Sequence, residues 1–148
     1  IPFKYHGAAY KKEFLTHFIE VPEEWTADCI VPVPLHENRL KARGYNQSAV
    51  IAAVIAERTC LPLRQDLLFR IKDTPQQAKM QKQERMQNVK GAFKAEPQCK
   101  GLRIILVDDV RTTGSTLREC ALELKRKGTE KVYAATACCS MEEIRNGN

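Results

Sequence analysis

The segment from residue 103 to 116, RIILVDDVRTTGST, limits the fold of this chain more than any other. Residues 104–107 are Ile, Ile, Leu and Val, a composition typical of a strand that is buried on both faces of a parallel sheet. Two carboxylates follow directly, and a turn around Gly114 then leads into a helical pattern that begins near Ser115. This order predicts an α/β protein with polar groups at the carboxyl end of a central strand.

The acidic pair and the turn have complementary chemistry. Successive side chains of a strand point to opposite sides, so Asp108 and Asp109 cannot both face the core. Burying an unpaired carboxylate is costly, and at least one of them must meet solvent, a cation or hydroxyl donors. Residues 111–116 offer backbone N–H groups and four hydroxyls at the start of a helix, which suits an anion. Together these features predict a pocket for ribose 5-phosphate. The alternative is that Asp109 and Ser115 only form a turn and cap the helix.

The same segment closely resembles the phosphoribosyl pyrophosphate (PRPP) motif of the type I phosphoribosyltransferases, a hydrophobic run followed by D-D and T-G-x-T. The resemblance implies an α/β fold with a central, mainly parallel sheet flanked by helices. It implies that Asp108 and Asp109 contact the ribose hydroxyls. It also implies a loop that binds the 5-phosphate, formed by Arg111, Thr112, Thr113, Gly114, Ser115 and Thr116.

A second informative stretch follows the apolar run 29–34. Proline donates no hydrogen bond, so we expect this strand to lie near an edge of the sheet or to end at its prolines. A polar, basic loop is expected over 35–48, at the carboxyl end of a strand, where open α/β sheets bind ligands. Residues 46–60 then predict an apolar helix with Asn46 as its cap.

Residues 31–48, VPVPLHENRLKARGYNQS, resemble the V-P-V-P-L-x(3)-R-x(3)-R-G-Y-N-Q-S signature of the ComF family of competence-related proteins. The corresponding loop of type I enzymes handles pyrophosphate. The resemblance therefore implies three pyrophosphate candidates, Arg39, Arg43 and His36. Forked guanidinium groups pair well with phosphate, although surface arginines can also serve solubility alone. The resemblance covers residues 3–139. ComF proteins usually carry an N-terminal four-cysteine zinc module, which this chain lacks, so no zinc is expected in it.

The remaining patterns complete the expected order of elements. Residues 72–83 form a long polar stretch that the resemblance implies is the flexible loop closing over PRPP, and Arg70 stands just before it in a ComF-like pattern. The chain should fray over 140–148. The other expected elements are helices over 9–19, 84–90 and 117–127, strands over 67–71, 92–95 and 131–139, and a turn over 97–101.

Composition sets wider limits. At 148 residues the chain fits one domain, 1–148. The resemblance to type I phosphoribosyltransferases implies that 1–25 is a helical remnant of the hood over an acceptor. The net charge of +6 suits a phosphorylated sugar or nucleic acid as ligand and does not distinguish between the two.

Six cysteines without a C-x-x-C pair indicate a reduced, cytoplasmic protein. No apolar run approaches the length of a membrane span. An oligomer is compatible with the sequence.

Two functions remain open at this point. The first is a PRPP-binding, ComF-like protein linked to DNA uptake, with PRPP or a related phosphorylated ribose as ligand and single-stranded DNA or competence proteins as partners. The alternative is an active phosphoribosyltransferase that moves ribose 5-phosphate onto an unknown base or amine. That chemistry is mostly positioning and electrostatics, so no covalent nucleophile is expected. Mg²⁺ would be held through PRPP rather than directly by the protein.

Overall fold

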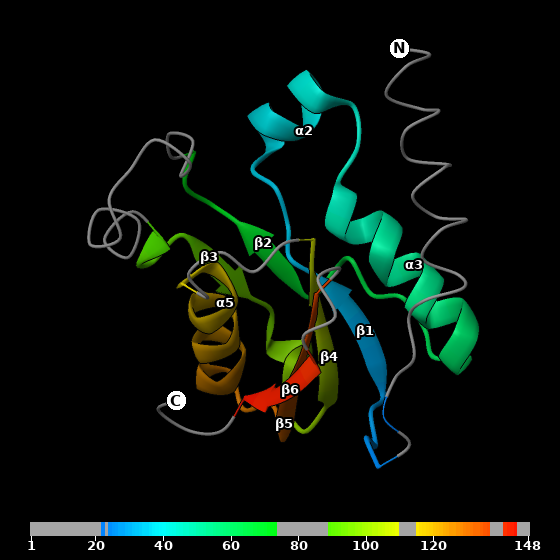
Figure 1. Cartoon of the computed structure of the whole chain (residues 1–148). Coiled ribbons are helices and arrows are strands. Elements are labelled where there is room, and N and C mark those ends of the chain that lie inside the picture. Colours follow the sequence, from blue (N-terminus) through cyan, green and yellow to red (C-terminus); the bar gives the residue numbers. More distant parts are fainter. Residues whose placement is uncertain (1–21, 23, 74–88, 110–114, 137–140, 145–148) are drawn as a thin grey trace.

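The structure is a computed structural model, and it describes residues 22, 24–73, 89–109, 115–136 and 141–144 (Figure 1). The predicted helix over 9–19 and residues 84–88 of the one predicted over 84–90 lie outside the described residues. The helices are α2 (Glu37–Arg43), α3 (Gln47–Thr59), α5 (Ser115–Arg126) and the short 3-10 helix η2 (Pro97–Cys99). The strands are β1 (Cys29–Pro32), β2 (Leu68–Arg70), β3 (Phe93–Ala95), β4 (Arg103–Asp108), β5 (Lys131–Thr136) and β6 (Met141–Ile144).

The main sheet has the strand order β1-β4-β5-β6. β1, β4 and β5 are parallel, and β6 pairs with β5 in the antiparallel direction. The predicted α/β fold with a central, mainly parallel sheet is therefore confirmed. β1 stands at the outer end of this order and stops at Pro32, as its prolines predict.

The strand β6 corrects the prediction that 140–148 frays. Residues 141–144, MEEI, form neither an apolar run nor a strict apolar–polar alternation, so no pattern marks them as a strand. Their backbone instead pairs with the edge of β5, in a register that runs from Val132 opposite Ile144 to Ala135 opposite Met141. Edge backbone groups need hydrogen-bond partners whatever the side chains are, and the sequence pattern does not record this need.

Alternating residues of β4 divide the core between two helices. Ile105 and Val107 belong to a cluster with Ile51 and Ile55 of α3. On the other face, Ile104 and Leu106 belong to a cluster with residues of α5 and of the β2–β3 hairpin. Trp25 stacks on Tyr133, with ring centroids 4.5 Å apart, at the edge of the α3 cluster. Helices α3 and α5 thus cover opposite faces of the sheet (Figure 1).

The carboxyl ends of β1 and β4 form a topological switch point, here called the crevice. The helix α3 follows β1 on one face, whereas α5 follows β4 on the other. The two strand ends stay together because the Val33 N–H donates to the Val107 carbonyl at 2.8 Å. Open α/β sheets bind ligands where successive connections leave on opposite faces. The fold thus places Asp108 at the position where such sheets bind ligands.

The helix α2 corrects the predicted loop over 35–48. It contains no buried residue, so it carries no apolar periodicity that sequence reasoning could detect. Its ends stabilise it instead. The His36 side chain accepts from the Asn38 N–H at 3.2 Å, and Gly44, at φ +89°, donates its N–H to the Leu40 carbonyl at 2.8 Å.

Candidate functional site

The acidic pair lies at the crevice, where the sequence predicts it. Asp108 is the last residue of β4, and its Oδ1 accepts from the Ser48 hydroxyl at 3.1 Å and from the Asp109 N–H at 2.9 Å. Ser48 lies in the first turn of α3, 60 residues away in the sequence. The predicted need of a carboxylate for hydroxyl donors is met, although the sequence did not indicate which hydroxyl.

Asn46 fixes the position of Ser48. Its side-chain oxygen accepts from the Ser48 N–H at 3.0 Å, which confirms Asn46 as the cap of α3. Its Nδ2 donates to the Val33 carbonyl at 3.0 Å, at the end of β1. One side chain therefore ties the start of α3 to the carboxyl end of β1 and places the Ser48 hydroxyl beside Asp108.

The environment of Asp108 disfavours its charge. Burial, and next the neighbouring Asp109 carboxylate, raise the pKa of Asp108 to about 6, while the hydrogen bond from Ser48 lowers it. A charged group that is poorly solvated and close to a like charge gains from a cation or from hydroxyl donors.

We predict that Asp108→Asn stabilises the ligand-free chain at pH 8 and leaves its stability unchanged below pH 4. Because the pKa of Asp108 is higher in the folded chain than in the unfolded chain, its neutral carboxyl favours the folded state. This contribution to stability is complete below the unfolded pKa near 4 and is lost as the pH rises through about 6. The amide remains neutral and can still accept both hydrogen bonds. A shift of this size corresponds to about 1–3 kcal/mol in the free energy of unfolding. Urea unfolding at both pH values measures it, and a variant less stable than the native chain at pH 8 would contradict it.

Only part of the predicted 5-phosphate loop can be placed. Ser115, which is buried, and Thr116 begin α5, so this end of the loop is the start of a helix, as predicted. Both residues have further interactions within the chain. The remaining predicted phosphate ligands lie outside the described residues: Arg111, Thr112, Thr113 and Gly114.

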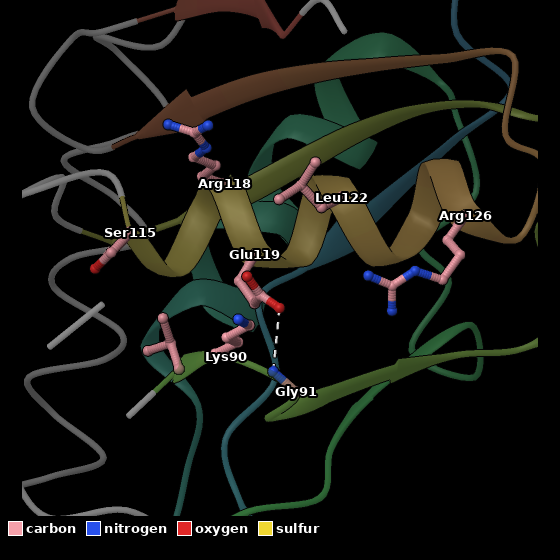
Figure 2. A pocket seen from close by; sticks show the side chains of 8 residues that line it. Lys90, Gly91, Ser115, Arg118, Glu119, Leu122 and Arg126 are labelled. Carbon is pink, nitrogen blue, oxygen red and sulfur yellow. Dashed lines mark hydrogen bonds between the residues drawn. The ribbon is translucent and has the colours of Figure 1, made fainter. Parts of the chain in front are cut away.

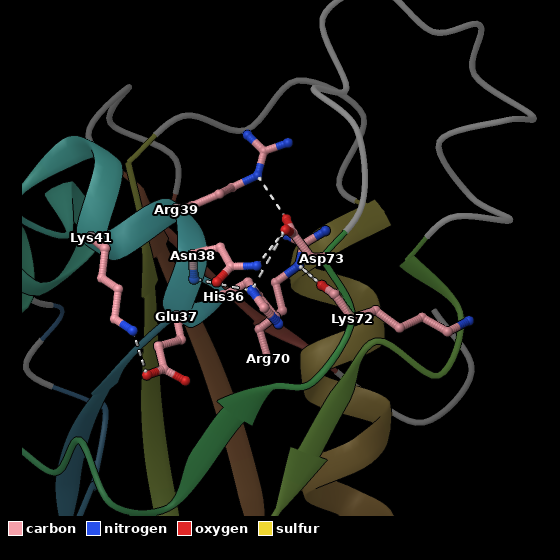
Figure 3. A network of polar contacts seen from close by, with 8 residues as sticks. All are labelled: His36, Glu37, Asn38, Arg39, Lys41, Arg70, Lys72 and Asp73. Carbon is pink, nitrogen blue, oxygen red and sulfur yellow. Dashed lines mark hydrogen bonds and ion pairs between the residues drawn. The ribbon is translucent and has the colours of Figure 1, made fainter.

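Two of the three pyrophosphate candidates meet at a common carboxylate (Figure 3). Asp73, which follows β2, lies with its Oδ1 3.8 Å from Arg39 Nε and its Oδ2 3.9 Å from His36 Nδ1. Asn38 Nδ2 donates to the same Oδ2 at 3.0 Å. Arg43 occupies the last turn of α2 and is partly exposed. Because α2 follows β1, these groups stand at the same edge of the sheet as Asp108.

His36 has a structural role, as the N-cap of α2, besides its predicted role in binding pyrophosphate. Its Nδ1 accepts from the Asn38 N–H, so that nitrogen carries no proton in this geometry. A neutral ring then has its proton on Nε2, which is the nitrogen that could donate to a phosphate. The histidine can therefore cap α2 and bind an anion at the same time.

Sequence reasoning missed Arg70 as a site residue. Its guanidinium lies 5.3 Å from the centre of the Phe93 ring, and its Nε donates to the Lys72 carbonyl at 3.1 Å. Burial, then the positive charge of Arg39, lower the pKa of Arg70, while the charges of Asp73 and Asp108 raise it. Arg70 is thus electrostatically coupled to both α2 and the acidic pair. Its place in the ComF-like pattern was the signal that could have indicated it.

A cavity of about 460 Å³ runs along α5 (Figure 2). Its wall includes Lys90, Arg118 and Arg126, with Glu119 Oε1 accepting from the Gly91 N–H at 3.1 Å. Of the predicted PRPP-site residues that the structure describes, Ser115 alone lines this cavity. We assign it no ligand, because neither Asp108 nor Asp109 lines it.

The described cysteines are free thiols. Cys29, Cys99 and Cys120 are buried, and burial raises the pKa of each thiol, as expected for small core side chains. Among the described residues, no three His, Cys, Asp or Glu side chains gather closely enough to hold a metal ion. A metal at Asp108 and Asp109 would need further ligands, for example from a bound polyphosphate or water.

Comparison with known proteins shows the family of this chain. A family described as "Phosphoribosyl transferase domain" matches residues 45–146, which include the acidic pair and α5. The chain belongs to this family. The matched residues include the segment 103–116, and the observed α/β fold agrees with membership of this family.

Curated relatives confirm the resemblance to ComF proteins. The chain is 35% identical over 120 residues to Competence protein F of Haemophilus influenzae, covering 79% of this chain and 50% of that protein. It is 32% identical over 132 residues to Competence protein ComFC of Bacillus subtilis, covering 85% and 52%. DNA utilization protein YhgH of Escherichia coli matches at 34% over 111 residues, covering 75% and 49%. The chain thus spans about half the length of these relatives.

A solved structure supports the fold. The glutamine PRPP amidotransferase of Bacillus subtilis superposes on 88% of this chain and 26% of its own, with a TM-score of 0.56 and 21% identity. At this identity the likeness concerns the fold alone. Separately, none of the helices that the structure describes is both long and apolar enough to span a membrane.

Proposed function

We propose that this chain binds PRPP with Mg²⁺ in the crevice between the carboxyl ends of β1 and β4. The observation that carries the proposal is the convergence of Asp108 with the cationic groups of α2 at one edge of the sheet, with Arg70 coupled to both. PRPP has the matching chemistry, because sugar hydroxyls suit carboxylates and pyrophosphate suits arginine.

In this proposal each group has one role. Asp108 and Asp109 accept hydrogen bonds from the ribose hydroxyls, and the loop from Arg111 to Thr116 holds the 5-phosphate. Arg39, Arg43 and the Nε2 of His36 hold the pyrophosphate. Mg²⁺ neutralises part of the ligand's charge. The two carboxylates support it, and its remaining ligands are phosphate oxygens and water.

We further propose that the protein acts in the cytoplasm in a process linked to DNA uptake, with single-stranded DNA or competence proteins as partners. The names of the relatives in Haemophilus influenzae and Bacillus subtilis support this link. Buried thiols such as Cys99 and Cys120 fit a reducing compartment.

A second candidate is phosphoribosyl transfer itself. Anionic groups beside the ribose and cationic groups beside the pyrophosphate suit a step in which the bond from C1 to the pyrophosphate oxygen breaks. Its electron pair leaves with pyrophosphate, positive charge develops on the sugar, and an acceptor forms the new bond to C1. Asp108 and Asp109 would stabilise that sugar, while Arg39 would stabilise the leaving group. Release of pyrophosphate that depends on an added amine or base would distinguish transfer from binding alone.

We predict that PRPP raises the thermal midpoint of the chain in the presence of Mg²⁺. A ligand at one hundred times its Kd stabilises by about 2.7 kcal/mol, which corresponds to roughly 5–10 °C for a domain of this size. Ribose 5-phosphate should give a smaller rise, because it lacks the pyrophosphate. ATP serves as the control for general attraction of polyanions to a chain of net charge +6. An ATP shift equal to that of PRPP would contradict the proposal.

A further inference from the structure

Asp73 has contacts that the proposed function does not use. It lies three residues beyond the end of β2, and its carboxylate reaches across to Asn38 and Arg39 of α2 and to the His36 cap (Figure 3). Arg39 is one of the groups proposed above to hold pyrophosphate, whereas His36 would hold it through Nε2 and not through the Nδ1 that lies near Asp73. A carboxylate of the chain therefore stands where an anionic group of the ligand is expected.

The contacts of Asp73 are loose enough to be exchanged. Its distances of 3.8 Å to Arg39 and 3.9 Å to His36 exceed ordinary hydrogen-bond lengths, and only the bond from Asn38, at 3.0 Å, is short. The Asp73 side chain is 43% exposed, so water screens its charge interactions. A ligand can replace such contacts at small energetic cost.

The local charge also favours exchange. Asp73 carries one negative charge, whereas Arg39 and Arg70 bring two positive charges close enough to act on each other. A pyrophosphate group carries more negative charge and more acceptor oxygens than a carboxylate, and guanidinium groups bind phosphate well. It would balance this cluster better than Asp73 does.

We propose that Asp73 is an affinity- and specificity-determining residue, whose carboxylate occupies the pyrophosphate position in the ligand-free chain and competes with pyrophosphate for Asn38 and Arg39. This inference rests on the proposed function and deepens it. Asp73 lowers affinity for anions at this position and leaves the 5-phosphate position unaffected. It thereby favours ligands whose charge is high enough to displace it.

The test is calorimetric titration of inorganic pyrophosphate with Mg²⁺ into the native chain and into Asp73→Asn. Because the contacts are exposed and loose, we expect a three- to tenfold lower Kd in the variant, with the Kd for ribose 5-phosphate changed less than twofold. Asp66→Asn is the matched control. It removes the same charge at the other end of β2, where Asp66 pairs with Arg64 at 2.8 Å, and should change the Kd for pyrophosphate less than twofold.

Each result has a distinct meaning. Unchanged or weaker pyrophosphate binding in Asp73→Asn, with normal binding by the native chain, would overturn the competition and leave the proposed function intact. Weaker binding would mean that Asp73 assists the ligand, for example through Mg²⁺. An equal gain in pyrophosphate affinity in Asp66→Asn would also overturn the competition, because the change in net charge alone would then explain the effect. If neither protein bound pyrophosphate, both the competition and the pyrophosphate position of the proposed function would be wrong.

Discussion

Replacing Ile105 by Ala is expected to lower the free energy of unfolding by about 2–5 kcal/mol, the usual range for removing a buried isoleucine side chain. Ile105 is 1% exposed and lies in the middle of β4, opposite Ile30 of β1 and Tyr133 of β5. It also belongs to the cluster formed with α3. The substitution would leave a cavity, and both neighbouring strands and α3 would lose the packing contacts that Ile105 makes. Domains of this kind are stable by only about 5–15 kcal/mol, so the loss is severe.

The midpoint of urea unfolding measures this effect, and Ile71→Ala provides the control. Ile71 directly follows β2 and is 56% exposed, so the same substitution there should change the free energy of unfolding by about 0.5 kcal/mol or less. Similar losses at the two positions would contradict the place of β4 at the centre of the core.

The second large effect is expected on ligand binding. The double variant Asp108→Asn, Asp109→Asn should weaken the binding of PRPP with Mg²⁺ at least 100-fold. Hydrogen bonds to a charged group contribute about 1.5–3 kcal/mol each, and the variant loses the charge of two such groups. Their sum corresponds to about 100-fold or more in Kd. The weakening should not arise from unfolding, because Asp108→Asn is predicted to stabilise the ligand-free chain at pH 8.

Asp66→Asn again provides the control for this comparison. It removes a carboxylate that pairs with Arg64, at the other end of β2 from Asp73. It should bind PRPP as the native chain does. Retention of near-native affinity by the double variant would show that the acidic pair does not hold the ribose.

The sequence predicts the centre of the fold well because the signal there is strong. Residues 104–107 are all apolar, and the acidic pair follows them at once, so both β4 and the edge of the sheet at which the polar groups gather were predictable. The cap at Asn46 was predictable too, since an amide side chain before an apolar helical run has a specific local role.

Other elements lacked such a signal. The helix α2 buries no residue and depends on its caps, so its sequence looks like a loop. The strand β6 pairs through its backbone with β5, and its short sequence shows no strand pattern. Neither a capped helix without buried residues nor a backbone pairing of this kind leaves an apolar pattern in the sequence.

The candidate site, too, was predictable only in part. The need of Asp108 for a hydroxyl donor followed from its chemistry, but Ser48, 60 residues earlier, is brought to it only by the folding of α3 onto β4. Likewise, Asn38 and Asp73 are 35 residues apart and meet because β2 ends beside α2. Such contacts depend on tertiary structure, and no local pattern in a single sequence contains them.

The central claim, a PRPP site at the crevice, is tested most directly by calorimetric titration of PRPP with Mg²⁺ into the native chain and into the Asp108→Asn, Asp109→Asn variant. We expect micromolar binding by the native chain, about −8 kcal/mol, that disappears in the variant. Absence of binding by folded native chain would contradict the claim, and equal binding by the two proteins would place the ligand elsewhere.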